Sequence, residues 1–247
     1  MSDKRKTALI TGSGRNIGRA MAHDLAKDGF NIIVNGSSSR EPCDRVADEV
    51  RALGVDAEVM MCNVGDKAEL ETMGAAALKR FGSVDVIVNN VAIRPISPFL
   101  EVDEDEWNRV FDINLNAPVR LARMFLPGMI EANWGRIVNF TGMNAMRGHA
   151  NRPHVSTSKH AVLGLTRSLA VEFGKFGVTI NCISPGPIKS ERDDPEFEAY
   201  IAKTIGTNPT RRQGTAAEVS AAVRMLVSEG GAYINGQMIQ VNGGAAL

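Results

Sequence analysis

The stretch "TGSGRNIGRA" (residues 11–20) follows the apolar run "TALI" (residues 7–10) and leads into an amphipathic segment. Gly12 and Gly18 permit a tight turn and the close packing of a helix against a strand. The start of such a helix offers free backbone N–H groups and a partial positive charge to a pyrophosphate. An ordinary strand-to-helix turn is the alternative interpretation, but the position between a first strand and a first helix favours a dinucleotide site.

Apolar runs recur along the chain, and most of them precede a longer amphipathic segment. They are rich in Val and Ile and do not alternate with polar residues, which is typical of parallel strands buried on both faces. The alternation of strand and helix predicts an α/β fold, with a doubly wound, mostly parallel sheet and helices on both faces. The seven runs are residues 7–10, 31–35, 57–62, 84–89, 135–140, 178–183 and 237–241.

The chain has 247 residues, which suits a single domain over residues 1–247. Residues 189–214 differ from the rest because they are charged and contain proline. We expect this segment to leave the sheet and to cover a ligand as a lid.

The composition restricts the class of partner. Basic and acidic residues balance at 28 each, so we expect a small molecule as partner and neither a nucleic acid nor a membrane.

Cys43, Cys62 and Cys182 lack the paired spacing of a metal site, which predicts inert thiols and no metal. The N-terminus has no signal-peptide apolar region, and no apolar run approaches the length of about 18 residues that spans a membrane; we therefore expect a soluble, cytoplasmic protein.

Several segments resemble, in order, those of the short-chain dehydrogenase/reductase family. That family's fingerprint is Thr-Gly, three variable residues, Gly or Ala, a variable residue and Gly, and residues 11–18 match it with Asn16 in place of the middle glycine. The segments that match further along are "CNV" (62–64), "VNNVA" (88–92), "FDINLNAP" (111–118), "NCISPGPIKS" (181–190) and "NGQMIQVNGG" (235–244).

The resemblance implies a Rossmann-type fold and a nicotinamide dinucleotide as cofactor. It also implies which residues contact the cofactor, from the turn and from the ends of later strands. These residues are Gly12, Asn16, Ile17, Gly18, Asn63, Asn90, Lys159, Pro185, Gly186, Ile188 and Ser190.

The choice between the two dinucleotides depends on the end of the second apolar run, "VNGSSSR" (residues 34–40). A carboxylate there binds the ribose hydroxyls of NAD and repels a 2′-phosphate, but Gly36 occupies the position. Ser37 and Arg40 follow it, and Arg15 lies in the Gly-rich turn, where both arginines could reach a phosphate. NADP(H) is therefore favoured over NAD(H), with simple solvation of the two arginines as the alternative.

The catalytic residues depart from the family pattern. The family uses a serine, a tyrosine, a lysine and an asparagine, and the resemblance assigns the last two to Lys159 and Asn114. Tyrosine lies four residues before the lysine, on the same helix face, but this sequence has Val155 there, in "RPHVSTSKH" (residues 152–160). The serine position, thirteen residues earlier, is Gly142. Neither side chain can transfer a proton.

Five other side chains are candidates to replace the missing acid. His149 is the candidate we retain, because the loop it occupies lines the substrate cleft in the family; an exposed loop histidine is the alternative. His154 lies roughly 100° around the helix from Lys159, and strand alternation turns Thr141 to the opposite side. Tyr200 and Tyr233 cannot be placed from the sequence.

Loops around the expected cleft carry several polar side chains. Arg94, Arg147 and Arg152 suit a carboxylate or another anion, so an anionic substrate is one expectation. Surface ion pairs with Glu101 or Asp103 are the alternative. The substrate pocket is predicted to consist of Arg94, Gly142, Asn144, Arg147 and Val155.

Three functions remain open on these residues. The first is an NAD(P)-dependent oxidoreductase acting on a small carbonyl or alcohol, with an atypical active site. The second is a hydrolase or lyase on the same scaffold that uses Lys159, Asn114 and His149, and the third is a catalytically inactive dinucleotide-binding subunit. The resemblance also implies a homotetramer or homodimer, assembled through residues 103–132 and 153–175 and the C-terminal strand.

Overall fold

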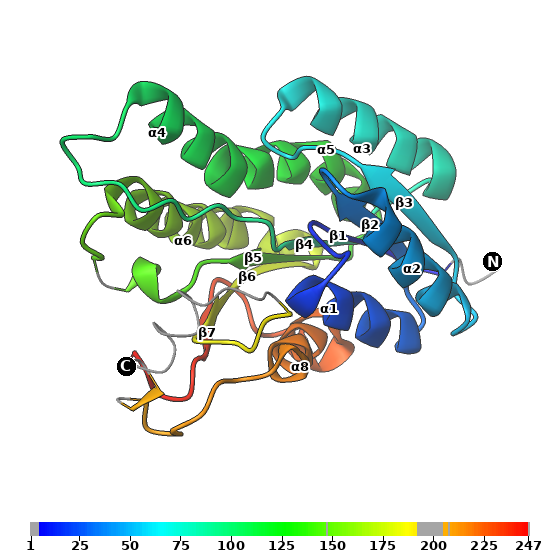
Figure 1. The fold of residues 1–247 in the computed structure, drawn as a ribbon. Coiled ribbons are helices and arrows are strands. Elements are labelled where there is room, and N and C mark those ends of the chain that lie inside the picture. The colour runs from blue at the N-terminus through cyan, green and yellow to red at the C-terminus, as the bar shows by residue number, and fades with distance from the viewer. Residues whose placement is uncertain (1–4, 147, 192–204, 207, 247) are drawn as a thin grey trace.

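The strands form one parallel sheet. In the computed structural model, residues 5–146, 148–191, 205–206 and 208–246 are described, and Figure 1 shows their arrangement. The sheet has seven strands in the order β3-β2-β1-β4-β5-β6-β7. These are β1 (Thr7–Ile10), β2 (Asn31–Gly36), β3 (Ala57–Met61), β4 (Val86–Asn89), β5 (Gly135–Phe140), β6 (Val178–Pro185) and β7 (Met238–Val241). Every predicted strand is confirmed, and its ends differ by at most two residues from those expected.

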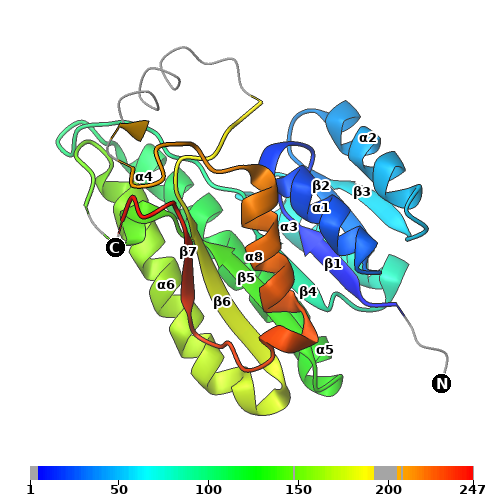
Figure 2. The same ribbon diagram turned by 90° about the horizontal axis from the view of Figure 1, so that it is seen from below.

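Helices cover both faces of the sheet, as predicted. Figure 2 shows α1 and α8 in front of the strands, on the face they share with α2, while α3, α5 and α6 cover the other face. The helices are α1 (Asn16–Lys27), α2 (Arg40–Arg51), α3 (Lys67–Phe81), α4 (Glu104–Phe111), α5 (Ala117–Glu131), α6 (Pro153–Phe173) and α8 (Ala216–Val227).

Alternating strand residues divide the core into two layers. Ala8 and Ile10 pack with α1, α2 and α8, whereas Leu9, between them, packs with α3 and α5. All three are completely buried, so both faces of β1 are covered. A fully buried aliphatic side chain stabilises the fold by about 1.5–3 kcal/mol relative to exposure, and this is why the strands appear in the sequence as unbroken apolar runs.

The ends of several helices follow from local sequence. Asp66 caps α3 by accepting hydrogen bonds from the backbone N–H groups of Ala68 and Glu69, and Gly82 ends the helix with φ +77°. Pro153 occupies the first turn of α6, where its missing N–H costs nothing. These signals fix where the chain re-enters the sheet.

The connection between α4 and α5 has a conformation that was not predicted. Residues Asp112–Asn116 form a π-helical turn that joins α4 to α5. Such turns are rare and are frequent at functional sites, and this one contains Asn114.

Among the helices described, none combines the length and the apolar character needed to cross a bilayer. Among all the residues that the structure describes, no three His, Cys, Asp or Glu side chains cluster as metal ligands would.

Candidate dinucleotide and catalytic site

The Gly-rich turn has the conformation that its glycines predict. Gly12 has φ +65°, and a Cβ atom added there would lie 2.8 Å from Val91 Cγ2. A Cβ atom on Gly18 would lie 2.2 Å from the carbonyl oxygen of Gly12, so only glycine lets α1 pack on the turn. Asn16 adopts φ +51°, a left-handed conformation that asparagine tolerates better than most residues, which explains how it can occupy a glycine position.

The start of α1 is electrostatically suited to an anion. Asn16, the first helical residue, follows Arg15, whose side chain makes no capping hydrogen bond, and the first turn contains no acidic residue. Ile17 lies in the same turn and is partly buried. The free N–H groups of this turn and the helix dipole therefore remain available for a phosphate.

Four hydrogen bonds hold the turn against neighbouring strands. Ser13 Oγ accepts a hydrogen bond from the Asn35 backbone N–H at 3.0 Å, and Asn35 Oδ1 accepts one from the Gly12 N–H at 3.2 Å. Asn90 Nδ2 donates to the carbonyl oxygen of Thr11 at 2.9 Å, and Thr11 Oγ1 accepts from the Asn90 N–H. Sequence reasoning included Asn90 but missed Ser13 and Asn35, because nothing in their spacing indicated that these two residues pair across strands.

The candidates for the adenosine end lie at the surface. Arg15, Ser37 and Arg40 are exposed, and Arg40 Nε lies 3.4 Å from Asp44 Oδ1. Arg15 forms no ion pair within the described ranges of the chain. Asn63 is also exposed, and its Oδ1 accepts a hydrogen bond from the Gly65 N–H at 3.1 Å.

The segment predicted to hold the nicotinamide end follows β6 directly. Pro185 is the last residue of that strand, and the Gly186 N–H donates to the carbonyl oxygen of Val241. A Cβ atom on Gly186 would lie 2.7 Å from Asn242 Cα, so glycine is needed for the C-terminal tail to pack here. Ile188 forms a β-bridge with Gly214, and Ser190 is partly buried.

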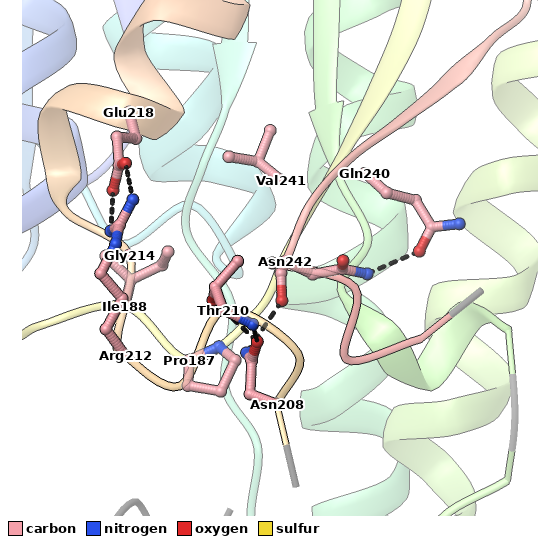
Figure 3. Close-up of a pocket in the computed structure, with 11 residues that line it drawn as sticks. Pro187, Ile188, Asn208, Thr210, Arg212, Gly214, Glu218, Gln240, Val241 and Asn242 are labelled. Carbon is pink, nitrogen blue, oxygen red and sulfur yellow. Dashed lines mark hydrogen bonds and ion pairs between the residues drawn. The ribbon is translucent and has the colours of Figure 1, made fainter. Parts of the chain in front are cut away.

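A cavity of about 170 Å³ lies on the tail side of this segment (Figure 3). Pro187 and Ile188 line one part of it, and Asn208 donates a hydrogen bond to the carbonyl oxygen of Asn242 at 3.1 Å. Arg212 and Glu218 form an ion pair at its rim, and this pairing together with the Thr215 N–H lowers the pKa of Glu218 to about 2. Sequence reasoning did not identify this cavity, because it depends on the return of the C-terminal tail.

A second cavity, of about 550 Å³, lies between Asn63 and the π-helical turn. Asp66, Asp105 and Asp112 line it together with Arg109. Arg120 links two of the lining residues, because it donates to Asp112 Oδ1 at 3.0 Å and to the carbonyl oxygen of Gly65.

Lys159 is almost completely buried. Its Nζ donates a hydrogen bond to the carbonyl oxygen of Phe140 at 2.6 Å, at the end of β5. Burial lowers the pKa of Lys159 to about 7, and the nearby charge of Arg94 acts in the same direction. An amine with such a pKa holds or releases a proton near neutral pH.

Asn114 supports the loop after β4. Its Oδ1 accepts from the Ile93 N–H at 2.9 Å, and its Nδ2 donates to the Ile93 carbonyl oxygen and to Ser158 Oγ. Asn114 is 2% exposed, so this amide is a structural link between the π-helical turn, the loop and α6. The resemblance had assigned it a catalytic role.

The positions assigned to the family's serine and tyrosine differ in how much room surrounds them. Gly142 has φ +96° and ψ 170°, a conformation that is essentially restricted to glycine, and an added Cβ atom would meet no atom within 4 Å. Val155 is completely buried on α6, and its carbonyl oxygen accepts from Ser158 Oγ. The serine position is therefore open but strained, and the tyrosine position is filled.

The other proton-transfer candidates contact groups other than the Lys159 amine. His149 is exposed, and its Nδ1 lies 2.7 Å from the carbonyl oxygen of Ala150. His154 is buried against α4, with Nε2 3.3 Å from Glu106 Oε1. Thr141 Oγ1 donates to the carbonyl oxygen of Ile183, and Tyr233 is fully exposed.

The predicted substrate pocket is only partly described. Arg94 is exposed and acts electrostatically on Lys159, which places it near the catalytic candidates. Asn144 belongs to a short 3-10 turn, Met143–Ala145, whereas Arg147, Tyr200 and most of the predicted lid lie outside the described residues. Asp103 accepts from the Glu106 N–H as the cap of α4.

The residues of the turn fit a nicotinamide dinucleotide. The close approaches at Gly12 and Gly18 leave the backbone bare where a pyrophosphate would bind, and the start of α1 offers N–H groups to it. The ends of β1, β2 and β4 meet at this edge of the sheet, which is where ligands bind in doubly wound folds.

Comparisons with known proteins agree with this geometry. A family model described as enoyl-(acyl carrier protein) reductase matches residues 12–246. The chain is similar to the 3-oxoacyl-[acyl-carrier-protein] reductase FabG of Staphylococcus aureus (strain Mu50), with 34% identity over 239 residues and 97% of each chain covered. It is also similar to the protein of that name from Pseudomonas aeruginosa, with 32% identity over 244 residues, covering 99% of this chain and 98% of the other.

A solved structure supports the same relationship. The crystal structure of acetoin dehydrogenase YohF from Salmonella typhimurium matches with a TM-score of 0.89 and 28% identity, covering 97% of this chain and 95% of that one. The family model and these relatives extend over nearly the whole chain, including the turn and the sheet edge described above. The chain therefore belongs to the short-chain dehydrogenase/reductase family of NAD(P)-dependent oxidoreductases.

Proposed function

We propose that the protein interconverts a small carbonyl compound and its alcohol, with NADP(H) as the favoured cofactor. The observation that carries this proposal is the combination of a complete dinucleotide turn with a buried lysine whose pKa is lowered to about 7. The names of the relatives, a 3-oxoacyl reductase and an acetoin dehydrogenase, describe redox chemistry at such groups and support the same reaction class.

The preference for NADP(H) is supported by the end of β2. Gly36 carries no carboxylate there, so no negative charge opposes a 2′-phosphate. Ser37 and the guanidinium groups of Arg15 and Arg40 are exposed around this end and supply donors and positive charge.

In this proposal, the cofactor supplies or accepts a hydride when it is bound, and the protein manages the proton. Lys159 provides that proton on reduction and accepts it on oxidation, directly or through water, because its pKa of about 7 allows both states near neutrality. Gly142 leaves open space where the family's serine would stand, which gives a substrate oxygen or a water molecule room to approach. Asn114 positions the loop after β4 through Ile93.

His149 and Arg94 are proposed to contact the substrate. His149 is an exposed imidazole in the loop after β5, and Arg94 lies in the loop after β4 close enough to influence the charge of Lys159. A guanidinium at this place suits a substrate that carries a carboxylate. An anionic carbonyl compound is therefore the substrate class that we favour, with Asn144 and Arg147 as further members of the pocket.

Turnover of NADPH with a panel of carbonyl compounds tests the proposal. The panel should pair each neutral ketone or aldehyde with a relative that carries a carboxylate, and the near-ultraviolet absorbance of the reduced nicotinamide should be followed. We expect oxidation of NADPH with at least one acid of the panel, and Arg94→Ala should raise KM for that acid more than for its neutral counterpart. Absence of turnover across the panel, despite measurable NADPH binding, would reject the redox proposal.

A second candidate function rests on Lys159 and the charge of Arg94 near it. A buried amine with a lowered pKa, next to an arginine, is also suited to polarising a carbonyl or activating water in a non-redox reaction. Conversion of a carbonyl substrate without change in the nicotinamide absorbance identifies that reaction. Cofactor binding with neither kind of turnover identifies a non-catalytic subunit instead.

The assembly proposed for the protein is a homotetramer or homodimer. It rests on the family resemblance, in which α4, α5, α6 and the C-terminal strand form the contacts. Light scattering on the purified protein measures the mass directly; the mass of a single chain, 26.6 kDa, would contradict this assembly.

A further inference from the structure

Two glycines near the adenosine end of the site are not required by backbone conformation. Gly14 lies in the Gly-rich turn and Gly36 ends β2, and neither has a positive φ. An alanine could adopt either backbone conformation without strain. Backbone conformation therefore does not explain why these two positions are glycine.

Space explains both glycines, and the same sulfur atom limits that space. A Cβ atom on Gly36 would lie 2.6 Å from Cys43 Sγ, and one on Gly14 would lie 2.9 Å from it. The next atoms around Gly36 belong to Met61, at 3.6 and 3.7 Å, which are ordinary contacts. Cys43 is thus the obstacle to a side chain at residue 36.

The sulfur is held in place. Cys43 is 2% exposed in the first turn of α2 and packs in the core layer that contains Val46 and Ala47. Its Sγ lies 3.8 Å from the carbonyl oxygen of Ser39, one helical turn earlier. Helical side chains have few allowed rotamers and Cys43 is packed among core residues, so moving the sulfur away from Gly36 costs free energy.

We propose that Cys43 is a specificity-determining residue for the dinucleotide. Its sulfur fills the space beside Gly36 and keeps a carboxylate from being placed at the end of β2, which leaves this end open to a 2′-phosphate. The inference rests on the proposed dinucleotide function and adds a steric cause to the cofactor preference. It predicts that residues 36 and 43 act as a coupled pair.

A double-mutant cycle tests the coupling through cofactor binding. Gly36→Asp, Cys43→Ala and the double variant are compared by the dissociation constants for NADH and NADPH. We expect Gly36→Asp alone to weaken the binding of both dinucleotides by about tenfold or more, because the new side chain displaces the sulfur and with it the Gly-rich turn. In the double variant, NADH should bind within about threefold of the wild-type protein, while NADPH stays weakened by charge repulsion.

Cys62 provides a matched control. It is also 2% exposed, and its N–H donates to the carbonyl oxygen of Gly36, yet its sulfur is not among the three atoms nearest to a Cβ on Gly36. Cys62→Ala combined with Gly36→Asp should therefore not restore NADH binding. The inference would be overturned if Cys62→Ala restored NADH binding to Gly36→Asp as well as Cys43→Ala does. It would also be overturned if Gly36→Asp bound NADH equally well with and without Cys43→Ala.

Thermal unfolding provides a readout that needs no cofactor. Gly36→Ala should lower the Tm by about 3–10 °C through overpacking, and most of this loss should disappear when Cys43→Ala is already present. Additive shifts would contradict the steric coupling. If the wild-type protein prefers NADH or binds neither dinucleotide, the proposed function fails, but the thermal cycle still decides whether Cys43 excludes a side chain at residue 36.

Discussion

Gly142 occupies the position that the resemblance assigns to the family's serine, and it has no side chain that could transfer a proton. The sequence comparison indicated only that the family's serine was missing. The structure adds that the backbone at this position has φ +96°, where a side chain is strained even though nothing crowds it. The loss of the serine is therefore accompanied by a backbone conformation that the serine would not favour.

Restoring the serine should cost stability. We expect Gly142→Ser to lower the free energy of unfolding by about 1–3 kcal/mol, measured by denaturant titration, because the residue must adopt a conformation that is essentially limited to glycine. Gly148→Ser is the control: Gly148 lies in the same loop, also has open space around an added Cβ, and has no positive φ. A similar loss in both variants would show that the backbone of Gly142 is not strained.

Lys159 leads to a pH prediction. Its pKa is lowered to about 7 from an ordinary value of 10.5, so the unfolded chain binds more protons than the folded protein between these values. The stability of the folded state should therefore rise with pH above about 7. Burial raises the pKa values of Cys62 and Cys182 from 9.0 to about 11, so their contribution decreases stability above pH 9. The interval from pH 7 to pH 9 separates the two effects.

Unfolding of the cofactor-free protein across this interval measures the contribution of Lys159. The wild-type protein should become more stable relative to Lys159→Met as the pH rises from 7 to 9. Lys175→Met, at an exposed lysine, should follow the wild-type profile. Parallel profiles for wild type and Lys159→Met would contradict a lowered pKa.

At the scale of elements, the sheet was predictable and the π-helical turn was not. Parallel strands covered on both faces must be apolar throughout, so runs such as residues 31–35 and 135–140 indicate their own strands. Asp112–Asn116 carries no comparable signal, because its conformation depends on what Asn114 contacts elsewhere in the fold. The hydrogen bond from Lys159 to the carbonyl oxygen of Phe140 was not predictable either, because it joins a helix to the end of a strand elsewhere in the fold.

Asn114 should contribute measurably to the stability of this turn. Asn114→Ala removes the partner of the Ile93 N–H and of Ser158, and we expect a loss of about 1–3 kcal/mol in the free energy of unfolding. Asn116→Ala is a control from the same turn, because its Nδ2 donates only to the partly exposed Asp112 and its removal should cost at most about 0.5 kcal/mol. Equal effects in denaturant titrations would mean that the buried amide has no special structural role.

For the whole molecule, the fold and the dinucleotide site were predictable from the order of the segments, whereas the substrate pocket was not. The ends of parallel strands meet at one sheet edge, so Gly12, Asn90 and Pro185 could be assigned to one site before any contact was known. Arg94 and His149 lie in loops whose positions depend on tertiary packing and on the bound substrate.

We propose that the chain keeps a dinucleotide site that favours NADP(H), although valine stands where the resemblance places the family's tyrosine. Calorimetric titration of the purified protein with NADPH and with NADH measures this preference. NADPH should bind at least about tenfold more tightly than NADH, a difference of about 1.4 kcal/mol in binding free energy. Binding of NADH that is tighter by the same factor, or no binding of either dinucleotide, would contradict it.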